Sequence, residues 1–143
     1  MRSWYVLFFQ LPGVPEMLLR SGNYAFLKRT LRRETVHPEA FTAADVRLYQ
    51  QARSRPGALT AALNYYRALF RHRRENRRQI RQVAAPTLLL WGERDRYLGL
   101  RLTEGLEPWV PDLRVERFPD ASHWLQNDVP AAVNRALVAF LRG

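Results

Sequence analysis

The sequence predicts an α/β chain in which about 82 helical residues precede a strand–helix–strand–helix unit, and two observations lead to this fold class. Before residue 83, apolar residues recur at helical spacing, most regularly from Leu59 to Phe70. From Val83 to Trp91 the chain instead holds a β-rich run without alternation, and a second apolar run spans residues 113–118. Such runs are typical of strands buried on both faces of a parallel sheet.

The helical part is predicted to begin after an extended stretch, residues 3–16. Two prolines and a glycine in that stretch break any regular element, so a first short helix is expected from about Pro15. Thr42 is expected to start another helix, with Asp45 in its first turn as a capping partner. Pro56 reads as a first-turn residue of the last and longest helix of this part.

The second part is predicted to be two parallel strands with their helices. Residues 97–106 should form a short helix, and Asp128 and Pro130 should start the final one. Two parallel strands bury both faces only when further strands and helices flank them. We therefore expect the other strands of the sheet to come from a partner, or from a longer protein of which this sequence is the C-terminal portion.

Composition narrows the class of protein. A length of 143 residues indicates one domain, and 47% hydrophobic residues with four Trp exclude a disordered tail. No apolar stretch approaches the roughly 18 residues of a transmembrane helix, and the first residues lack a signal-peptide cleavage site, so a cytoplasmic protein without a membrane segment is predicted. With no Cys and three scattered His, neither a metal site nor a cofactor is expected.

The net charge of +10 raises the possibility of an anionic partner. Five arginines recur at alternating spacings of four and three and would form one basic stripe on a continuous helix. They are Arg67, Arg71, Arg74, Arg78 and Arg81. Charge runs are more often solvated faces than ligand sites, so we expect no specific nucleic-acid binding and keep a non-enzymatic anion-binding or nucleic-acid-binding fragment as an alternative.

Two polar loops follow the two predicted strands. Asp95 lies in the first loop, Gly-Glu-Arg-Asp, and His123 lies in the second, Asp-Ala-Ser-His-Trp. Because the carboxyl ends of neighbouring parallel strands meet at one edge of a sheet, the carboxylate and the imidazole should lie side by side. The alternatives are a turn or N-cap aspartate for Asp95 and a surface histidine for His123.

Four segments carry a resemblance that covers nearly the whole chain: SWYVLFFQLPGVPE, ALNYYR, PTLLLWGERDRYLG and FPDASHWLQNDVPAAVNRAL. In order and spacing they resemble the cap and C-terminal part of α/β-hydrolases of the epoxide hydrolase and haloalkane (haloacid) dehalogenase group. By resemblance, residues 1–82 are expected to be a helical cap and residues 83–143 the C-terminal part of the hydrolase core. Asp95 then matches the family's triad acid and His123 its general base, in the order acid before histidine.

The resemblance also implies a reaction, the two-step covalent hydrolysis of small organic substrates such as epoxides. An Asp nucleophile attacks the substrate, cap tyrosines assist the leaving oxygen, and water activated by the His–Asp pair cleaves the ester. Tyr66 matches one of these tyrosines, whereas Phe8 stands where many epoxide hydrolases have the other. The predicted substrate-binding residues are Trp4, Phe8, Phe9 and Trp124, with packing as the alternative for the last three.

No glycine pair in these residues frames a Ser or Asp in the Gly-x-Ser/Asp-x-Gly pattern of the family's nucleophile elbow. We therefore expect this chain to be inactive by itself and to depend on the N-terminal half of the hydrolase core as its partner. A dehalogenase-type hydrolase remains the enzymatic alternative, because Trp4 lies in a Trp-Tyr stretch that resembles dehalogenases, in which ring N–H groups hold a halide.

Overall fold

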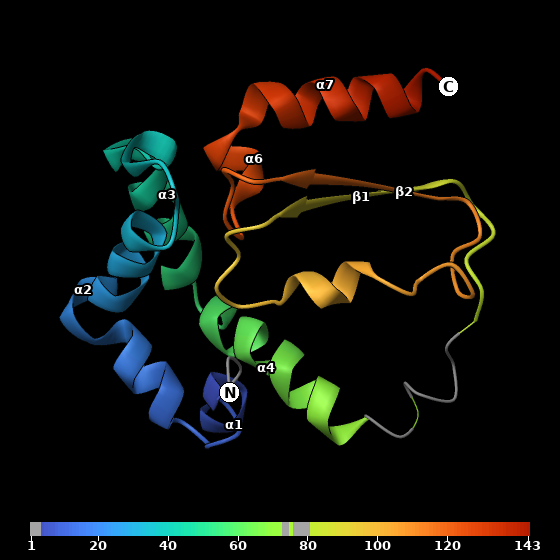
Figure 1. The fold of residues 1–143 in the computed structure, drawn as a ribbon. Helices are drawn as coiled ribbons and strands as arrows, with labels where there is room; N and C mark the ends of the chain where they lie inside the picture. The colour runs from blue at the N-terminus through green and yellow to red at the C-terminus, as the bar shows by residue number, and fades with distance from the viewer. Residues whose placement is uncertain (1–3, 73–74, 76–80) are drawn as a thin grey trace. The chain divides into compact units, whose positions relative to one another are not determined.

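A computed structural model describes residues 4–72, 75 and 81–143 (Figure 1). The described residues fall into two compact units. The first, here the helical unit, lies within residues 1–32 and 41–80, and the second, the sheet unit, consists of residues 33–40 and 81–143. The sequence-predicted division into a cap of residues 1–82 and a core part of residues 83–143 stays a prediction.

Four helices make up the described part of the helical unit: α1 (Trp4–Phe8), α2 (Val14–Arg33), α3 (Ala43–Ser54) and α4 (Ala58–Arg71). The prediction of an extended opening stretch is wrong for α1. The prolines and glycine that break helices begin only at Pro12, and the residues before them are free to turn. An i,i+4 pair stabilises that turn, because the rings of Tyr5 and Phe9 meet edge to face at 5.6 Å.

Local sequence signals set the start of α3 and α4. The capping box predicted for α3 is confirmed, because the Thr42 side chain accepts from Asp45 N while the Asp45 carboxylate accepts from Thr42 N. Helix α4 begins at Ala58, two residues later than expected for a first-turn Pro56. Gly57 has a positive φ of 76°, which ends the preceding turn and leaves Pro56 outside the helix.

The core of the helical unit is apolar. Its buried residues come from α2, α3, α4 and the segment before α3: Pro15, Leu31, Phe41, Val46, Leu59 and Leu63. Phe41 also packs edge to face on Tyr49, with ring centroids 5.6 Å apart. Helix α2 is interrupted near its middle, where Gly22, Asn23 and Tyr24 all have positive φ.

The sheet unit contains the two expected parallel strands, β1 (Thr87–Gly92) and β2 (Leu113–Phe118), paired from Thr87↔Leu113 to Gly92↔Phe118. In Figure 1 their arrowheads point the same way. Strand β1 begins four residues later than predicted, directly after Pro86, which has no N–H to donate to the ladder.

The remaining elements of the sheet unit are short except for the last helix: η1 (Pro38–Ala40), η2 (Leu100–Thr103), α6 (Leu125–Asp128) and α7 (Pro130–Leu141). Instead of the helix predicted over residues 97–106, only the 3₁₀ turn η2 forms, since Gly99 is extended and Gly105 has a positive φ of 66°. The final helix begins at Pro130 as expected, but Asp128 belongs to α6 and does not cap α7.

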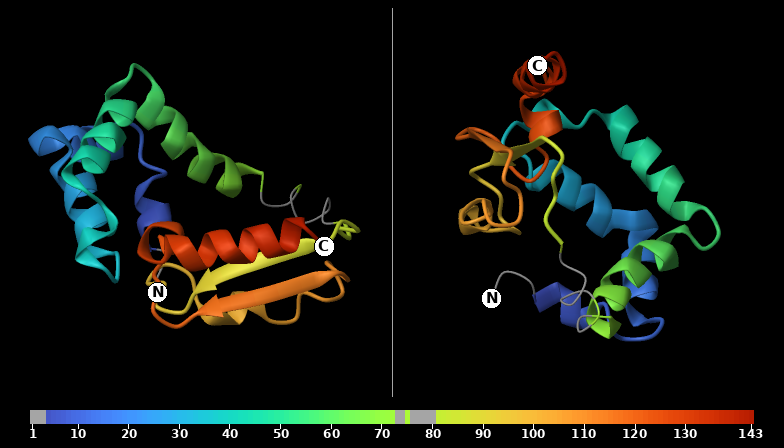
Figure 2. Two further views of the ribbon diagram at one scale, coloured as in Figure 1. Left: turned by 90° about the horizontal axis from the view of Figure 1, so that it is seen from above. Right: turned by 90° about the vertical axis from the view of Figure 1, so that its right-hand side faces the viewer.

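The sheet is less covered than its apolar sequence predicts. Helix α7 runs along the sheet (Figure 2) and contributes Val133 and Ala136 to the core, and both α7 and η2 contact β1. Every residue of β1 before Gly92 nevertheless remains partly exposed. Within the described ranges no third strand pairs with β1 or β2, so part of this apolar surface has no cover. No helix in these ranges is long and apolar enough to cross a membrane.

Candidate active site

The candidate site lies at the carboxyl edge of the sheet, where β1 and β2 end in register. Because Gly92 pairs with Phe118, the loops that follow the two strands leave from the same edge. Asp95 is the third residue after β1, and His123 is the fifth after β2. The parallel register therefore brings together two side chains that are 28 residues apart in sequence.

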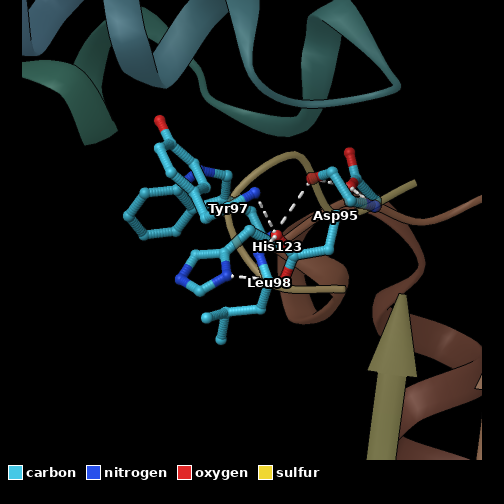
Figure 3. A network of polar contacts seen from close by, with 7 residues as sticks. Asp95, Tyr97, Leu98 and His123 are labelled. Carbon is cyan, nitrogen blue, oxygen red and sulfur yellow. Dashed lines mark hydrogen bonds and ion pairs between the residues drawn. The ribbon is translucent and has the colours of Figure 1, made fainter. Parts of the chain in front are cut away.

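Asp95 is held by three hydrogen bonds (Figure 3). Its Oδ1 accepts from the backbone N–H groups of Tyr97, at 2.7 Å, and of Leu98, at 2.9 Å. Its Oδ2 lies 2.8 Å from Nδ1 of His123. Only 7% of the Asp95 side chain is exposed. Backbone donors thus fix one carboxylate oxygen and leave the other aimed at the imidazole.

His123 is bound on one side of its ring and open on the other. A carboxylate beside Nδ1 favours the tautomer with the proton on that nitrogen, and this leaves the lone pair on Nε2, which points away from Asp95. The ring meets Tyr97 and Trp124 edge to face, with centroids 5.2 and 5.7 Å away. Because 40% of the His123 side chain is exposed, Nε2 is in a position to take a proton from water.

The two loops are bonded to each other as well as to their strands. Glu93 N donates to Phe118 O at 3.0 Å, and Arg94 N donates to Ala121 O at 2.9 Å. The close approach requires a residue without a side chain at position 92, since a Cβ on Gly92 would overlap the carbonyl oxygens of Ala121 and Ser122. Backbone contacts therefore fix the distance between the Asp95 loop and the His123 loop.

The other predicted site residues lie in the helical unit, except for Trp124. Tyr66 is half-buried on α4, and its ring meets those of Phe9 and Tyr5 at 5.1 and 6.0 Å. Phe8 is half-buried and lies 5.9 Å from the ring of Phe9. The structure thus brings Phe8, Phe9 and Tyr66 together, whereas the side chain of Trp4 lies outside the described residues.

The basic stripe is not a continuous free surface at its N-terminal end. Arg67 donates to both carboxylate oxygens of Glu16 and to the carbonyls of Phe9 and Leu11. Only 12% of its side chain is exposed. These hydrogen bonds also hold the pKa of Glu16 below its ordinary value of 4.5. Arg67 is therefore a structural cation and not a ligand-binding one, while Arg74 and Arg78 lie outside the described residues.

Comparison with known proteins identifies relatives of the chain. An AB hydrolase superfamily protein of Bacillus subtilis (strain 168) is 35% identical over 99% of the chain, and epoxide hydrolase 3 of Xenopus tropicalis is 37% identical over 98%. A solved structure, the M145A mutant of an epoxide hydrolase from Bacillus megaterium, matches 99% of the chain with a TM-score of 0.83 at 26% identity. No family model matches the chain.

The chain belongs to the α/β-hydrolases, in their epoxide hydrolase-like group. It corresponds to a C-terminal portion of these proteins, with the two parallel strands of that part of the fold. The chain spans 49% of the Bacillus subtilis relative, 39% of the Xenopus tropicalis relative and 52% of the Bacillus megaterium structure.

Sequence reasoning missed one buried group at this site, Asp128. Its carboxylate accepts from the backbone N–H and the hydroxyl of Ser122, the residue before His123. An Asp that immediately precedes Val-Pro at the start of a helix reads as a cap, and no local pattern distinguishes it from a loop anchor. In the described part of the chain no group of three or more His, Asp or Glu side chains could hold a metal ion.

Proposed function

We propose that this chain supplies the acid–base pair and one cap tyrosine of a hydrolase that opens epoxides through a covalent ester. The observation that carries the proposal is the His123–Asp95 pair, with Nδ1 bonded to a fixed carboxylate and Nε2 on the open side of the ring. The relatives that are epoxide hydrolases support an epoxide as the substrate class.

In the proposed first step, a carboxylate nucleophile attacks an epoxide carbon, and the bond from that carbon to the ring oxygen breaks. The nucleophile would come from a part of the hydrolase core that matches none of these 143 residues, since no nucleophile-elbow pattern occurs among them. The departing alkoxide takes a proton, which we assign to the Tyr66 hydroxyl. Tyr66 is the better candidate of the adjacent pair, because Tyr65 is 67% exposed while Tyr66 packs against Phe9.

In the proposed second step, Nε2 of His123 removes a proton from water as the oxygen attacks the ester carbonyl. The bond between the acyl carbon and the alkoxide oxygen then breaks, and the imidazolium gives its proton to that oxygen to complete the diol. The carboxyl group that remains on the enzyme loses its proton, which returns through solvent to the Tyr66 phenolate. Asp95 stabilises the imidazolium that forms and keeps the ring in its orientation. The ring of Trp124 borders the base and would cover one side of the attacking water.

The dehalogenase alternative rests on two sequence observations: Trp4 lies in a stretch that resembles dehalogenases, and Phe8 stands in place of the second tyrosine of many epoxide hydrolases. A halide leaves without a proton, so a cap with fewer phenols suits that reaction better. The nucleic-acid alternative loses support, because Arg67, the first member of the stripe, is occupied by Glu16 and two backbone carbonyls.

The proposal is tested by completing the core. The 143 residues are joined to the N-terminal half of the Bacillus subtilis relative, and we call this protein the completed hydrolase. Styrene oxide and a chloroalkane of similar size serve as substrates, and mass spectrometry of the quenched protein detects a covalent ester. We expect the completed hydrolase to form the ester and release diol, and the 143-residue chain alone to do neither. A folded completed hydrolase that forms no ester with either substrate would contradict the proposal.

A further inference from the structure

A buried carboxylate, that of Asp128, is hydrogen-bonded to the His123 loop, and it has no part in the reaction proposed above. Asp128 ends the short helix α6 and is only 8% exposed. Burying an ionised carboxylate costs several kcal/mol unless hydrogen bonds replace its water. Four protein donors do so here, two for each oxygen. These hydrogen bonds tie Asp128 to two other segments of the sheet unit.

One oxygen of Asp128 holds the two residues that flank His123. Oδ2 accepts from Ser122 N at 2.7 Å and from the Ser122 hydroxyl. The same hydroxyl oxygen accepts from Trp124 N at 3.1 Å. Ser122 itself is 2% exposed, so water does not compete for these bonds. The backbone on both sides of His123 is therefore tied, directly or through one hydroxyl, to a single carboxylate.

The other oxygen of Asp128 binds a distant segment of the same unit. Oδ1 accepts from Val36 N at 3.0 Å and from His37 N at 3.3 Å, in the connection between α2 and η1. An amide in place of the carboxylate offers one acceptor and one NH₂ group. Whichever way it turned, the NH₂ group would face two donors, either those of Ser122 or those of Val36 and His37. A charged carboxylate is thus the side chain that satisfies both partners.

A second contact also constrains the His123 loop. The carbonyls of Ala121 and Ser122 lie against Gly92, which is the last residue of β1 and directly precedes the Asp95 loop. The loop is therefore held both by this backbone contact and by the Asp128 carboxylate. If the bonds to Asp128 are lost, we expect the loop to shift and His123 Nδ1 to move away from Asp95.

We propose that Asp128 is a positioning residue for His123: by binding Ser122 and, through it, Trp124, it sets the imidazole against Asp95 and thereby serves the ester-hydrolysis step. This role rests on the proposed function. The role affects only the ester-hydrolysis step, because ester formation needs the nucleophile and Tyr66 but does not need His123. A displacement of about 1 Å in a catalytic group costs on the order of a hundredfold in rate.

The kinetic test compares Asp128→Asn with Asp112→Asn in the completed hydrolase. Asp112 is an exposed carboxylate just before β2, at the opposite end of the strands, so it matches the charge change without touching the loop. Single-turnover measurements with styrene oxide give the rate constants for ester formation and ester hydrolysis in folded protein. We expect Asp128→Asn to slow hydrolysis about 10- to 100-fold and to change ester formation less than about twofold. Asp112→Asn should change neither. Equal slowing of both steps, or no change in either, overturns the proposal.

A spectroscopic test separates this claim from the proposed reaction. Proton NMR of the completed hydrolase detects the His123 Nδ1–H that is hydrogen-bonded to Asp95, assigned by its loss in Asp95→Asn. It should persist in Asp112→Asn and disappear or shift in Asp128→Asn. If the protein forms no ester at all, the proposed function fails, and this signal alone decides the positioning role. Its persistence in Asp128→Asn overturns that role.

A milder variant covers the case in which Asp128→Asn does not fold. Ser122→Ala removes one donor to Asp128 and the acceptor of Trp124 N, but it leaves the Ser122 N–H bond in place. We expect the same pattern at smaller size, with hydrolysis slowed about 3- to 10-fold and ester formation unchanged. An unchanged hydrolysis step in folded Ser122→Ala overturns the proposal.

Discussion

Each of the two units holds a carboxylate paired with a basic side chain, and the pairs differ in which hydrogen-bonding atoms they leave unbonded. In the helical unit, Glu16 and Arg67 are 13% and 12% exposed, and Arg67 spends its remaining donors on the carbonyls of Phe9 and Leu11. In the sheet unit, Asp95 is more buried than Glu16, at 7% exposed, but 40% of the His123 side chain is exposed. The first pair is closed and fixes a turn. In the second pair, Nδ1 of His123 is bonded to Asp95, while Nε2 stays available to accept a proton.

The comparison shows why buried charge alone does not identify a catalytic group. Both pairs have short contacts of 2.8 Å, so distance does not separate them. The pairs differ in how many of their hydrogen-bonding atoms remain without a partner in the folded protein. Removing a member of the open pair should affect rate, and removing a member of the closed pair should affect stability.

The largest effect is expected from His123→Ala in the completed hydrolase. Loss of a general base slows ester hydrolysis by about 10⁴-fold, so the covalent ester should accumulate, and mass spectrometry of quenched samples measures it. His72→Ala is the control, since His72 is exposed and its ring pairs with the exposed Glu75. Normal diol release by His123→Ala would contradict the assignment of the base.

Tyr66→Phe tests whether the helical unit contributes to the chemistry. Loss of a positioned general acid should slow ester formation from styrene oxide by about 10³- to 10⁴-fold, the upper part of the usual range, because Phe8 supplies no second phenol. Ester hydrolysis should change little. Tyr65→Phe, at the exposed neighbouring position, serves as the control in single-turnover kinetics. If Tyr65→Phe is the damaging change, the two tyrosines exchange roles, and if neither matters a halide leaving group becomes the better assignment.

Arg67→Met tests the closed pair. The substitution leaves the largely buried Glu16 carboxylate and two backbone carbonyls without their hydrogen-bond donor. We expect it to lower the free energy of unfolding by about 3 kcal/mol. Urea denaturation of the 143-residue chain measures the loss. Arg71→Met, one turn further along α4 and exposed, should change stability by less than about 0.5 kcal/mol. Equal effects of the two substitutions would show that Arg67 is no more than a surface charge.

The smallest effect concerns pH. Arg67 lowers the pKa of Glu16 in the folded chain, so the unfolded chain binds the proton first as pH falls. The contribution of Glu16 to stability is complete above its ordinary pKa of 4.5 and is lost as pH falls through the lower, folded value. Urea midpoints from about pH 3 to about pH 7 should therefore fall less steeply with acid in Glu16→Gln than in the wild type. Parallel curves would remove Glu16 from the pH dependence.

Much of the candidate site follows from the sequence because its geometry is built from strand ends. Parallel strands in register place their following loops at one edge, so the sequence alone predicts that Asp95 and His123 pair, as they do in the structure. The start of α3 was equally predictable, because Thr42 and Asp45 bond within one turn. The catalytic roles of Asp95, His123 and Tyr66 stay predictions until the experiments above are done.

The sequence by itself determined the parallel strand pair, the helical character of the first part and the Asp–His juxtaposition, since each depends on apolar patterning or on the shared edge at which parallel strands end. Tertiary structure alone decided that Arg67 closes on Glu16, 51 residues away, and that Asp128 binds Val36, 92 residues away. It also decided that Gly92 must lack a side chain. The physical reason is that a buried charge or a close backbone contact is satisfied by whatever the fold brings to it, and partners so far apart leave no local pattern.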